Sequence, residues 1–271
     1  QFSGRLELLA KQWNISAEEA QQNWTSLILI AQQKEVEEQV EKHERVYVSF
    51  INTAQEIIIS GDKQSCKAVV KALQCPSIEV PFQNIIHHDF CRTADKELVE
   101  MHQFPIEAYP ETTFYSSISQ QKITLDSATI ARNSAEVCYQ SVNFPETCAN
   151  LYEQNARIFI ELGANATCSN WISNNLKGSE HLAISMNKKG KSDSQSLFEV
   201  LASLVSHGVD MDLSILYPVQ SSLKTARSFN KKISPSMRKF FISTCSHCPS
   251  IKPANSTFFR NNIFYIVPHF F

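Results

Sequence analysis

The order of the predicted elements indicates an α/β protein that carries an α+β insert. Residues 26–82 read as strand, helix, strand, strand, helix and strand, whereas residues 83–217 alternate helices with short strands. The chain has 271 residues, 43% of them hydrophobic, which is enough apolar material for one large domain or two small ones. We therefore divide it into a helical lead-in (1–25), the insert (26–82), a mixed region (83–217) and a tail (218–271).

The lead-in and the insert carry clear local signals. Ser16 and Glu19 form a capping-box pattern, which predicts a helix that begins there. In the insert, runs rich in β-branched residues alternate with amphipathic or capped segments. We predict strands at 26–31, 45–51, 56–60 and 78–82, and helices at 32–43 and 61–73. This β-α-β-β-α-β order is that of the ferredoxin-like split βαβ motif.

The mixed region is expected to form a layered α/β structure. Helical patterns occur near 88–103, 126–140, 144–155, 165–176 and 194–207, and strand patterns near 113–116, 157–160 and 181–185. Such alternation favours a mainly parallel sheet with helices packed against it. Because three strands are few for such a sheet, we expect further strands from sequence outside this chain.

The tail differs in composition from the rest. Lys and Arg cluster at 224–239, aromatic residues crowd 258–271, and no acidic residue follows Asp212. No helical or strand period organises this segment, so we expect it to be disordered. Within it, Cys245, His247 and Cys248 look like part of a zinc site. Because no second pair of ligands stands at finger spacing, we do not expect a metal there.

Composition excludes several classes of protein. The chain has only six glycines, and their positions form no G-x-G-x-x-G, no P-loop and no G-x-S-x-G. The net charge of −2 gives no positive electrostatic potential that would attract a nucleic acid. No run of about 18 apolar residues exists, so no membrane span is expected. Most of the eight cysteines lie on or beside apolar stretches, which indicates free thiols in a reducing, cytoplasmic setting. The chain begins with Gln1 and no signal segment follows, so we expect a fragment.

The strongest local signal for catalysis is the sequence His87-His88-Asp89. A histidine between a strand and a helix in an α/β protein is well placed as a general base. The alternative is a surface histidine pair followed by a helix-capping Asp89. A metal site is not expected, because no further His or Cys lies at ligand spacing.

Three weaker candidates lie in the second half of the mixed region. Gly163 follows a strand and precedes a helix, so backbone N–H groups there either point into a pocket or belong to an ordinary β-to-α turn. The paired acids Asp210 and Asp212 read as a solvated turn before a strand-like segment at 213–217. The basic loop at 188–191 either binds a phosphopantetheine or nucleotide phosphate or is simply solvated.

Four stretches together resemble the acyltransferase domain of iterative polyketide-type synthases, most closely that of polyunsaturated fatty acid and heterocyst-glycolipid synthases. They are RVYVSFINT with EIIISGD (45–62), VPFQNIIHH (80–88), YEQNARIFIELG continuing through ANATCSNW (152–171), and LASLVSHG with VDMDL (201–213) closing at Tyr217. The resemblance spans about residues 2–217. It implies a truncated hydrolase-like acyltransferase core with a ferredoxin-like subdomain.

The resemblance also implies a chemistry. In this family a serine in G-x-S-x-G attacks an acyl-CoA thioester, and a histidine takes the serine proton. By position His87 matches that base, with His88 as the alternate, and the peptide carbonyl near Val137 falls where the family orients the imidazole. Gly163 and Ala164 match a turn beside the active site, where the common family form has Gly-Pro-Gly.

The same resemblance implies which catalytic residues lie outside the chain and which substrate and partners it has. The serine, the oxyanion donor and a carboxylate-binding arginine are expected before Gln1, so this segment alone should be inactive. Malonyl-CoA or another acyl-CoA would be the substrate, with no bound cofactor. The partners would be an acyl carrier protein, through its phosphopantetheine thiol, and the ketosynthase of the same synthase. Two alternatives remain: a non-catalytic remnant or docking module of a synthase, and a free-standing ferredoxin-like ligand-binding protein.

Overall fold

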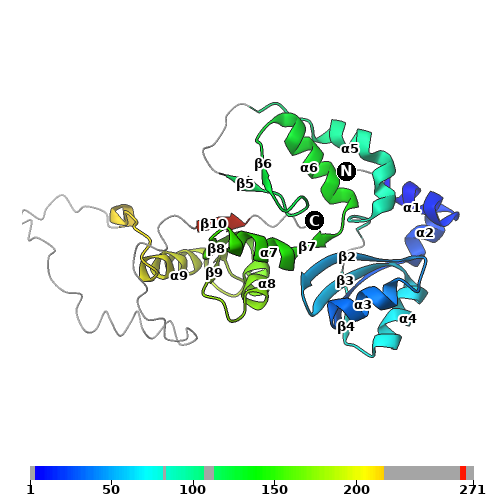
Figure 1. Ribbon diagram of the computed structural model, residues 1–271, viewed down its shortest axis with the longest axis horizontal. Helices are drawn as coiled ribbons and strands as arrows, with labels where there is room; N and C mark the ends of the chain where they lie inside the picture. Colours follow the sequence, from blue (N-terminus) through cyan, green and yellow to red (C-terminus); the bar gives the residue numbers. More distant parts are fainter. Residues whose placement is uncertain (1–3, 82–83, 107–112, 217–262, 267–271) are drawn as a thin grey trace, which may run out of the picture. The chain divides into compact units, whose positions relative to one another are not determined.

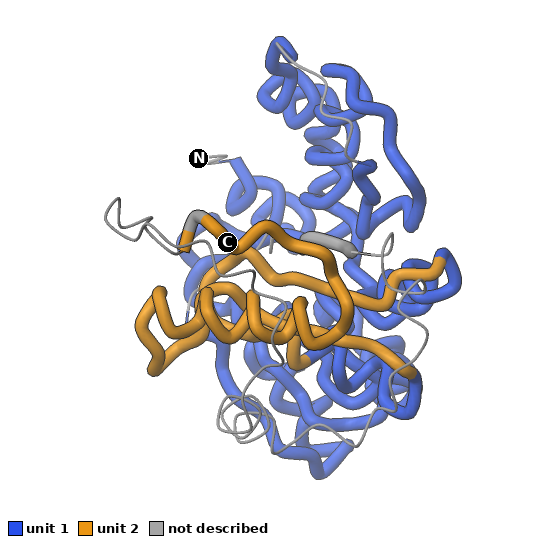
Figure 2. Tube along the Cα trace, turned by 90° about the vertical axis from the view of Figure 1, so that its left-hand side faces the viewer, with its two compact units in different colours: residues 1–154, 171–179, 270–271 blue, residues 155–170, 180–269 orange. Residues whose placement is uncertain are grey.

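A computed structural model describes residues 4–81, 84–106, 113–216 and 263–266. These residues form two compact units, shown in different colours in Figure 2. Unit 1 contains the described residues up to 154 together with 171–179, and unit 2 contains 155–170 and the described residues from 180 onward. Most of the segment predicted to be a disordered tail lies outside the described residues.

The ferredoxin-like order predicted for the insert is confirmed in unit 1. The sheet has the order β4-β1-β3-β2, and every neighbouring pair in it is antiparallel. Helices α3 and α4 lie together against one face of this sheet (Figure 1). The elements are β1 (Trp24–Ile30), α3 (Gln33–Val40), β2 (Val46–Thr53), β3 (Glu56–Asp62), α4 (Lys63–Leu73) and β4 (Ser77–Glu79).

Alternation along the strands places the core of this subdomain between the sheet and its two helices. Leu29, Ile57 and Ile59 from the strands and Val36 and Val69 from the helices are fully buried in one cluster. Burying each such side chain contributes about 1.5–3 kcal/mol. The apolar stripes of two short helices are therefore sufficient to hold them on the sheet.

The lead-in folds as two helices, α1 (Arg5–Trp13) and α2 (Ala17–Asn23). The predicted capping box is confirmed: Ser16 Oγ accepts from Glu19 N at 3.2 Å, and the Glu19 carboxylate accepts from Ser16 N at 3.0 Å. Trp13 donates to the Tyr47 hydroxyl at 3.1 Å, which ties the lead-in to β2.

The rest of unit 1 is mostly helical, and one short strand of it joins the sheet beside β2. The short strand β7 (Val142–Asn143), which the sequence does not predict, pairs parallel to β2 and extends the sheet to five strands. Helices α5 and α6 pack side by side (Figure 1). The elements are the 3₁₀ helix η1 (Asp89–Ala94), α5 (Asp95–His102), β5 (Phe114–Tyr115), β6 (Lys122–Ile123), α6 (Ser127–Tyr139), β7 and α7 (Phe144–Glu153).

Unit 2 contains the parallel sheet expected for the mixed region, but the strand predicted at 113–116 is not part of it: that segment forms β5, which pairs antiparallel with β6 in a separate hairpin of unit 1. Its order is β10-β8-β9 and both pairings are parallel. Ile158 and Ile160 of the sheet pack against Val200 and Leu204 of α9. The strands are β8 (Ile158–Ala164), β9 (Leu182–Asn187) and β10 (Ile263–Ile266), and the helices are α8 (Thr167–Asn175), whose second half belongs to unit 1, and α9 (Asp193–Ser206).

Two sequence predictions fail in unit 2. The strand-like segment at 213–217 contains instead the 3₁₀ helix η2 (Ser214–Leu216). The tail, for which no strand was predicted, contributes β10, because a run of β-branched and aromatic residues pairs readily with the free edge of β8. Among the described residues, no helix is long and apolar enough to cross a membrane.

Candidate active site around His87

His87 and His88 are both buried, so the interpretation as a surface histidine pair is wrong. Their exposed fractions are 7% and 2%. Asp89 does not cap a helix either, because its carboxylate accepts from Arg92 Nε at 2.7 Å. The pair lies between β4 and η1, where the sheet of the insert meets the end of α6.

The backbone of His87 is held in an uncommon conformation. Its φ angle is +65°, in the left-handed region that few non-glycine residues occupy. Its N–H donates to the carbonyl of Cys138 at 2.9 Å, which anchors the residue to the last turn of α6. Such conformations persist only where the surrounding structure fixes them, and they cluster at functional sites.

The imidazole of His87 is neutral near pH 7. Burial lowers its pKa from 6.5 to about 4, and the charge of Arg5 acts in the same direction. The main chain at Val137 and Gln140 favours the protonated ring, but less strongly than burial disfavours it. The ring lies 5.8 Å from that of Phe50, edge to face, and its buried Nδ1 has no hydrogen-bond partner among the described residues. A neutral imidazole is the form that accepts a proton. That Val137 orients the ring stays a prediction.

His88 is instead part of an aromatic cluster. Its ring centroid lies 5.1 Å from Trp24, 5.3 Å from Tyr47 and 5.4 Å from Phe90, which stacks on it. Both ring nitrogens are buried without partners in the described structure, and burial lowers the pKa of His88 to about 3. A ring enclosed on these faces is poorly placed to exchange a proton with a reactant, which favours His87 as the base.

An open hollow of about 580 Å³ adjoins the histidine pair. It lies between β2 and the end of α6 and contains apolar, aromatic and charged groups. Its lining residues are Val40, Val46, Tyr47, Val48, His87, His88, Asp89, Arg92, Tyr139, Gln140 and Ser141. The strongest catalytic candidate in the sequence therefore does border a space that a ligand can enter.

Behind Phe50, a polar network ties the β2–β3 hairpin to α8. The Glu56 carboxylate accepts from Trp171 Nε1 at 2.9 Å and from Asn52 Nδ2 at 2.8 Å. The Trp171 ring lies 6.1 Å from that of Phe50, which also lies against the His87 ring. The sequence does not predict this network, because its members are far apart in the chain and the local sequence shows only a tryptophan in a helix and a glutamate after a turn.

The segment around Gly163 differs from expectation. Gly163 and Ala164 belong to the end of β8, and the left-handed residue is Asn165, with φ +73°. The N-terminal amides of α8 are not free for a ligand: the buried Glu161 carboxylate accepts from Cys168 N at 3.2 Å and Ser169 N at 2.8 Å. Of the two alternatives, the one in which these N–H groups point into a pocket is therefore not supported at Cys168 and Ser169, and the role of Gly163 and Ala164 stays a prediction.

The remaining candidate residues are exposed, form an ion pair or lie outside the described residues. Asp212 is exposed and accepts from Ser214 N, as expected for a solvated turn. Of the basic loop, Lys188 and Lys189 are exposed, and Lys191 pairs with Glu199. Cys245, His247 and Cys248 lie outside the described residues. Within the described ranges, no group of three or more His, Cys, Asp and Glu side chains could hold a metal.

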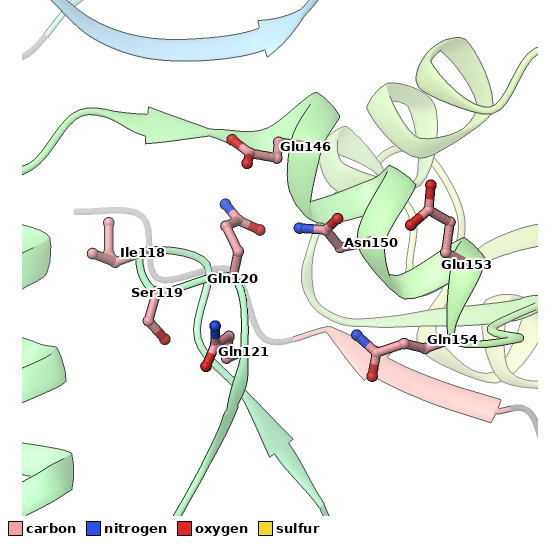
Figure 3. A pocket seen from close by; sticks show the side chains of 8 residues that line it. All are labelled: Ile118, Ser119, Gln120, Gln121, Glu146, Asn150, Glu153 and Gln154. Atoms are coloured by element: carbon pink, nitrogen blue, oxygen red, sulfur yellow. The ribbon is translucent and has the colours of Figure 1, made fainter.

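A second hollow, of about 640 Å³, lies between the β5–β6 hairpin and α7. Figure 3 shows the amides of Gln120 and Asn150 facing each other across it, with Glu146 and Glu153 on α7. Its lining, which also includes Ile118, Ser119, Gln121 and Gln154, contains no histidine or cysteine. Its carboxylates and amides offer hydrogen bonds to a polar ligand, and none of the predicted site residues lies there.

The fold is that of acyltransferase domains. The acyltransferase domain from the second module of the salinomycin polyketide synthase matches with a TM-score of 0.63 and 16% identity, over 81% of this chain and 56% of that domain. A malonyl-transacylase solved in complex with a type II polyketide synthase acyl-carrier protein matches with a TM-score of 0.58 and 14% identity, over 73% of this chain and 61% of that one. No protein-family model matches the chain.

The chain also has a curated sequence relative. It is one of the subunits of a polyunsaturated fatty acid synthase from Thraustochytrium sp., and it is 23% identical over 215 residues, which is 74% of this chain. The chain spans 10% of that protein's length and little more than half of the salinomycin domain.

Proposed function

We propose that this chain is part of an acyltransferase that moves a malonyl or other acyl group from CoA to the phosphopantetheine thiol of an acyl carrier protein, in polyketide or fatty acid synthesis. One observation carries the proposal: in a chain with the acyltransferase fold, a neutral, buried His87 borders an open hollow. The burial of both nitrogens of His88 supports His87 as the base in preference to its neighbour.

In this proposal the nucleophile is a serine outside the chain, because the sequence contains no G-x-S-x-G. His87 accepts the serine proton as the serine oxygen attacks the thioester carbonyl. The C–S bond then breaks, CoA leaves as the thiol with the proton that His87 held, and an acyl-serine ester remains. In the second half, His87 takes the proton of the carrier thiol, the thiolate attacks the ester, and the proton returns to serine.

The partner and substrate assignments rest on similar proteins. One of the similar structures is an acyl-carrier protein in complex with its malonyl-transacylase, and the sequence relative belongs to a polyunsaturated fatty acid synthase. We extend both to this chain and propose an acyl carrier protein as its partner; the ketosynthase of the same synthase is proposed as a second partner from the sequence resemblance alone. Acyl-CoA is its substrate and no bound cofactor takes part.

The test joins this chain to a preceding segment that carries a G-x-S-x-G serine and measures acyl transfer from malonyl-CoA to a carrier protein. We expect His87→Ala to lower the rate by about 10² or more, since a general base contributes roughly that factor. His87→Gln, which keeps a polar side chain of similar size, serves as the folding control and should be equally slow.

Two outcomes contradict the proposal. If His87→Ala keeps full activity while His88→Ala is inactive, His88 is the base. If the joined protein binds the carrier protein but transfers nothing even with both histidines present, the chain is a docking module, the alternative that its sequence leaves open.

A further inference from the structure

The strand β4 lies at one end of the sheet in unit 1. The sheet order β4-β1-β3-β2-β7 gives it a single neighbour, β1, and within the described residues no strand pairs with its other side. Its three residues, Ser77, Ile78 and Glu79, are all exposed. An exposed edge of this kind is a template on which a strand of another chain can pair.

The hydrogen bonds at the two ends of β4 show which of its main-chain groups point away from the sheet. Pro76 O accepts from β1 at 3.0 Å, and Val80 N donates to β1 at 2.9 Å. The N–H and C=O of one residue point to the same side of a strand, and successive residues alternate between the sides. Ile78 therefore faces β1 as Pro76 and Val80 do, whereas the N–H and C=O groups of Ser77 and Glu79 point outward.

The side chain of Ile78 is the apolar contact that this edge offers. In the register of β1 and β4 it lies beside Ile28. Because Leu27 and Leu29 pack under α3 and α4, Ile28 and Ile78 lie on the opposite face of the sheet. Ile78 is 63% exposed, and Ile30, on the same face, is 45% exposed. The exposed edge thus combines unpaired main-chain groups with an apolar surface that a further strand would cover.

We propose that β4 pairs antiparallel with β4 of a second copy of this chain, about a two-fold axis at Ile78. This register sets Ile78 opposite Ile78 of the second copy, and Ser77 opposite Glu79 at both ends. Each Ser77–Glu79 pair exchanges two main-chain hydrogen bonds through the outward groups of both copies. The two isoleucines form the pair between them that makes no hydrogen bonds with each other, where facing side chains lie closest.

The charges at this edge fit a second copy of the same strand. Glu79 is the only charged residue of β4, and the two-fold register does not place it opposite itself, so no like charges face each other. It lies instead opposite Ser77 of the second copy, which begins β4 shortly after the end of α4. Lys71 is exposed in the last turn of α4 and supplies the opposite charge at that end. The strand is therefore complementary to itself, as a two-fold interface requires.

The dimer is expected to be reversible, because the paired segment is short. Pro81 follows β4 and has no N–H, so the pairing does not extend beyond it. Sedimentation velocity of the full chain, from about 1 µM to about 1 mM, covers the range in which a small interface is half occupied. We expect the sedimentation coefficient to rise with concentration from the value of a monomer to that of a dimer.

Substitutions of Ile78 test the register, since this residue meets itself across the axis. Ile78→Lys places two like charges opposite each other and should raise the dissociation constant at least about tenfold. Ile78→Thr keeps a β-branched side chain with less apolar surface, and should raise it less. Val205→Lys, which changes an exposed aliphatic residue of α9, is the matched control and should leave the dissociation constant unchanged.

Crosslinking provides a second measurement that needs no estimate of affinity. Facing residues of a pair without hydrogen bonds have Cα atoms about 4.5 Å apart, which a disulfide can bridge. Ile78→Cys chains treated with diamide, which takes up the hydrogens of the two thiols, should therefore form a covalent dimer on a non-reducing gel. Ser77→Cys chains should crosslink much more slowly, because Ser77 lies opposite Glu79. The unmodified chain gives the background from the native cysteines.

A monomer at every concentration overturns the proposal, as does an unchanged dissociation constant for Ile78→Lys. Crosslinking of Ser77→Cys chains as fast as Ile78→Cys chains overturns the register. Circular dichroism shows whether each variant keeps its fold, and if Ile78→Lys is unfolded, Ile78→Thr and the two cysteine variants still decide. None of these results involves acyl transfer, so they are independent of the role of His87.

Discussion

The two buried histidines make the stability of the protein depend on pH. In the unfolded chain both have a pKa near 6.5, whereas in the folded chain the pKa is about 4 for His87 and about 3 for His88. Between these values the unfolded state binds more protons, so the free energy of unfolding falls as the pH falls from about 6.5 toward the folded pKa values. At pH 4.5 linkage gives a loss of about 2.5 kcal/mol for each histidine, or about 5 kcal/mol for the pair.

The variant His88→Phe isolates half of this effect. Phenylalanine fits among Trp24, Tyr47 and Phe90 without a titrating group, so the variant should lose about 2.5 kcal/mol less than the unmodified chain between pH 7.5 and 4.5. Urea unfolding followed by tryptophan fluorescence at several pH values measures the difference. Phe90→Leu is the control, because it disturbs the same cluster and should keep the full pH dependence. If His88→Phe and the unmodified chain have parallel stability curves, His88 is not buried in its neutral form and our account of the cluster is wrong.

Two further substitutions test the fold on which the site depends. Gly61→Ala would place a Cβ 2.0 Å from the carbonyl oxygen of Arg45 at a φ of +150°, so we expect it to lower the free energy of unfolding in urea by about 3 kcal/mol or more. The control Gly190→Ala, at φ +85° with open space around it, should lower it by only about 1 kcal/mol. Similar losses for the two variants would contradict the close approach of the strands at Gly61. Glu161→Gln weakens the charge-assisted hydrogen bonds to two backbone amides of α8, so we expect a loss of about 1–3 kcal/mol in the free energy of unfolding and faster hydrogen exchange of the Ser169 amide. Unchanged exchange would show that the carboxylate does not hold this end of the helix.

The sequence predicts the ferredoxin-like subdomain well because its signals are local. Ile57 and Ile59 are two residues apart in a β-branched run, so they lie on one face of the strand, and both are in the core. Ser16 and Glu19 specify a helix start through atoms three residues apart, and the structure contains both hydrogen bonds. Elements whose stability comes from distant partners are less visible: β7 has two residues, and only its pairing with β2 makes it a strand.

The histidine pair shows most clearly why local patterns do not define a site. Adjacent histidines can differ in their surroundings, and the sequence gives no indication which of His87 and His88 is enclosed by other rings. The answer lies in residues far along the chain: Trp24 and Tyr47 enclose His88, while Phe50 and the last turn of α6 hold His87 at the hollow. A motif of two histidines can therefore suggest acid–base chemistry, but the different surroundings of the two rings depend on the packing of three separate elements. Both histidines border the hollow, but the His88 ring packs among three aromatic rings whereas the His87 ring, on a left-handed backbone with φ +65°, contacts Phe50.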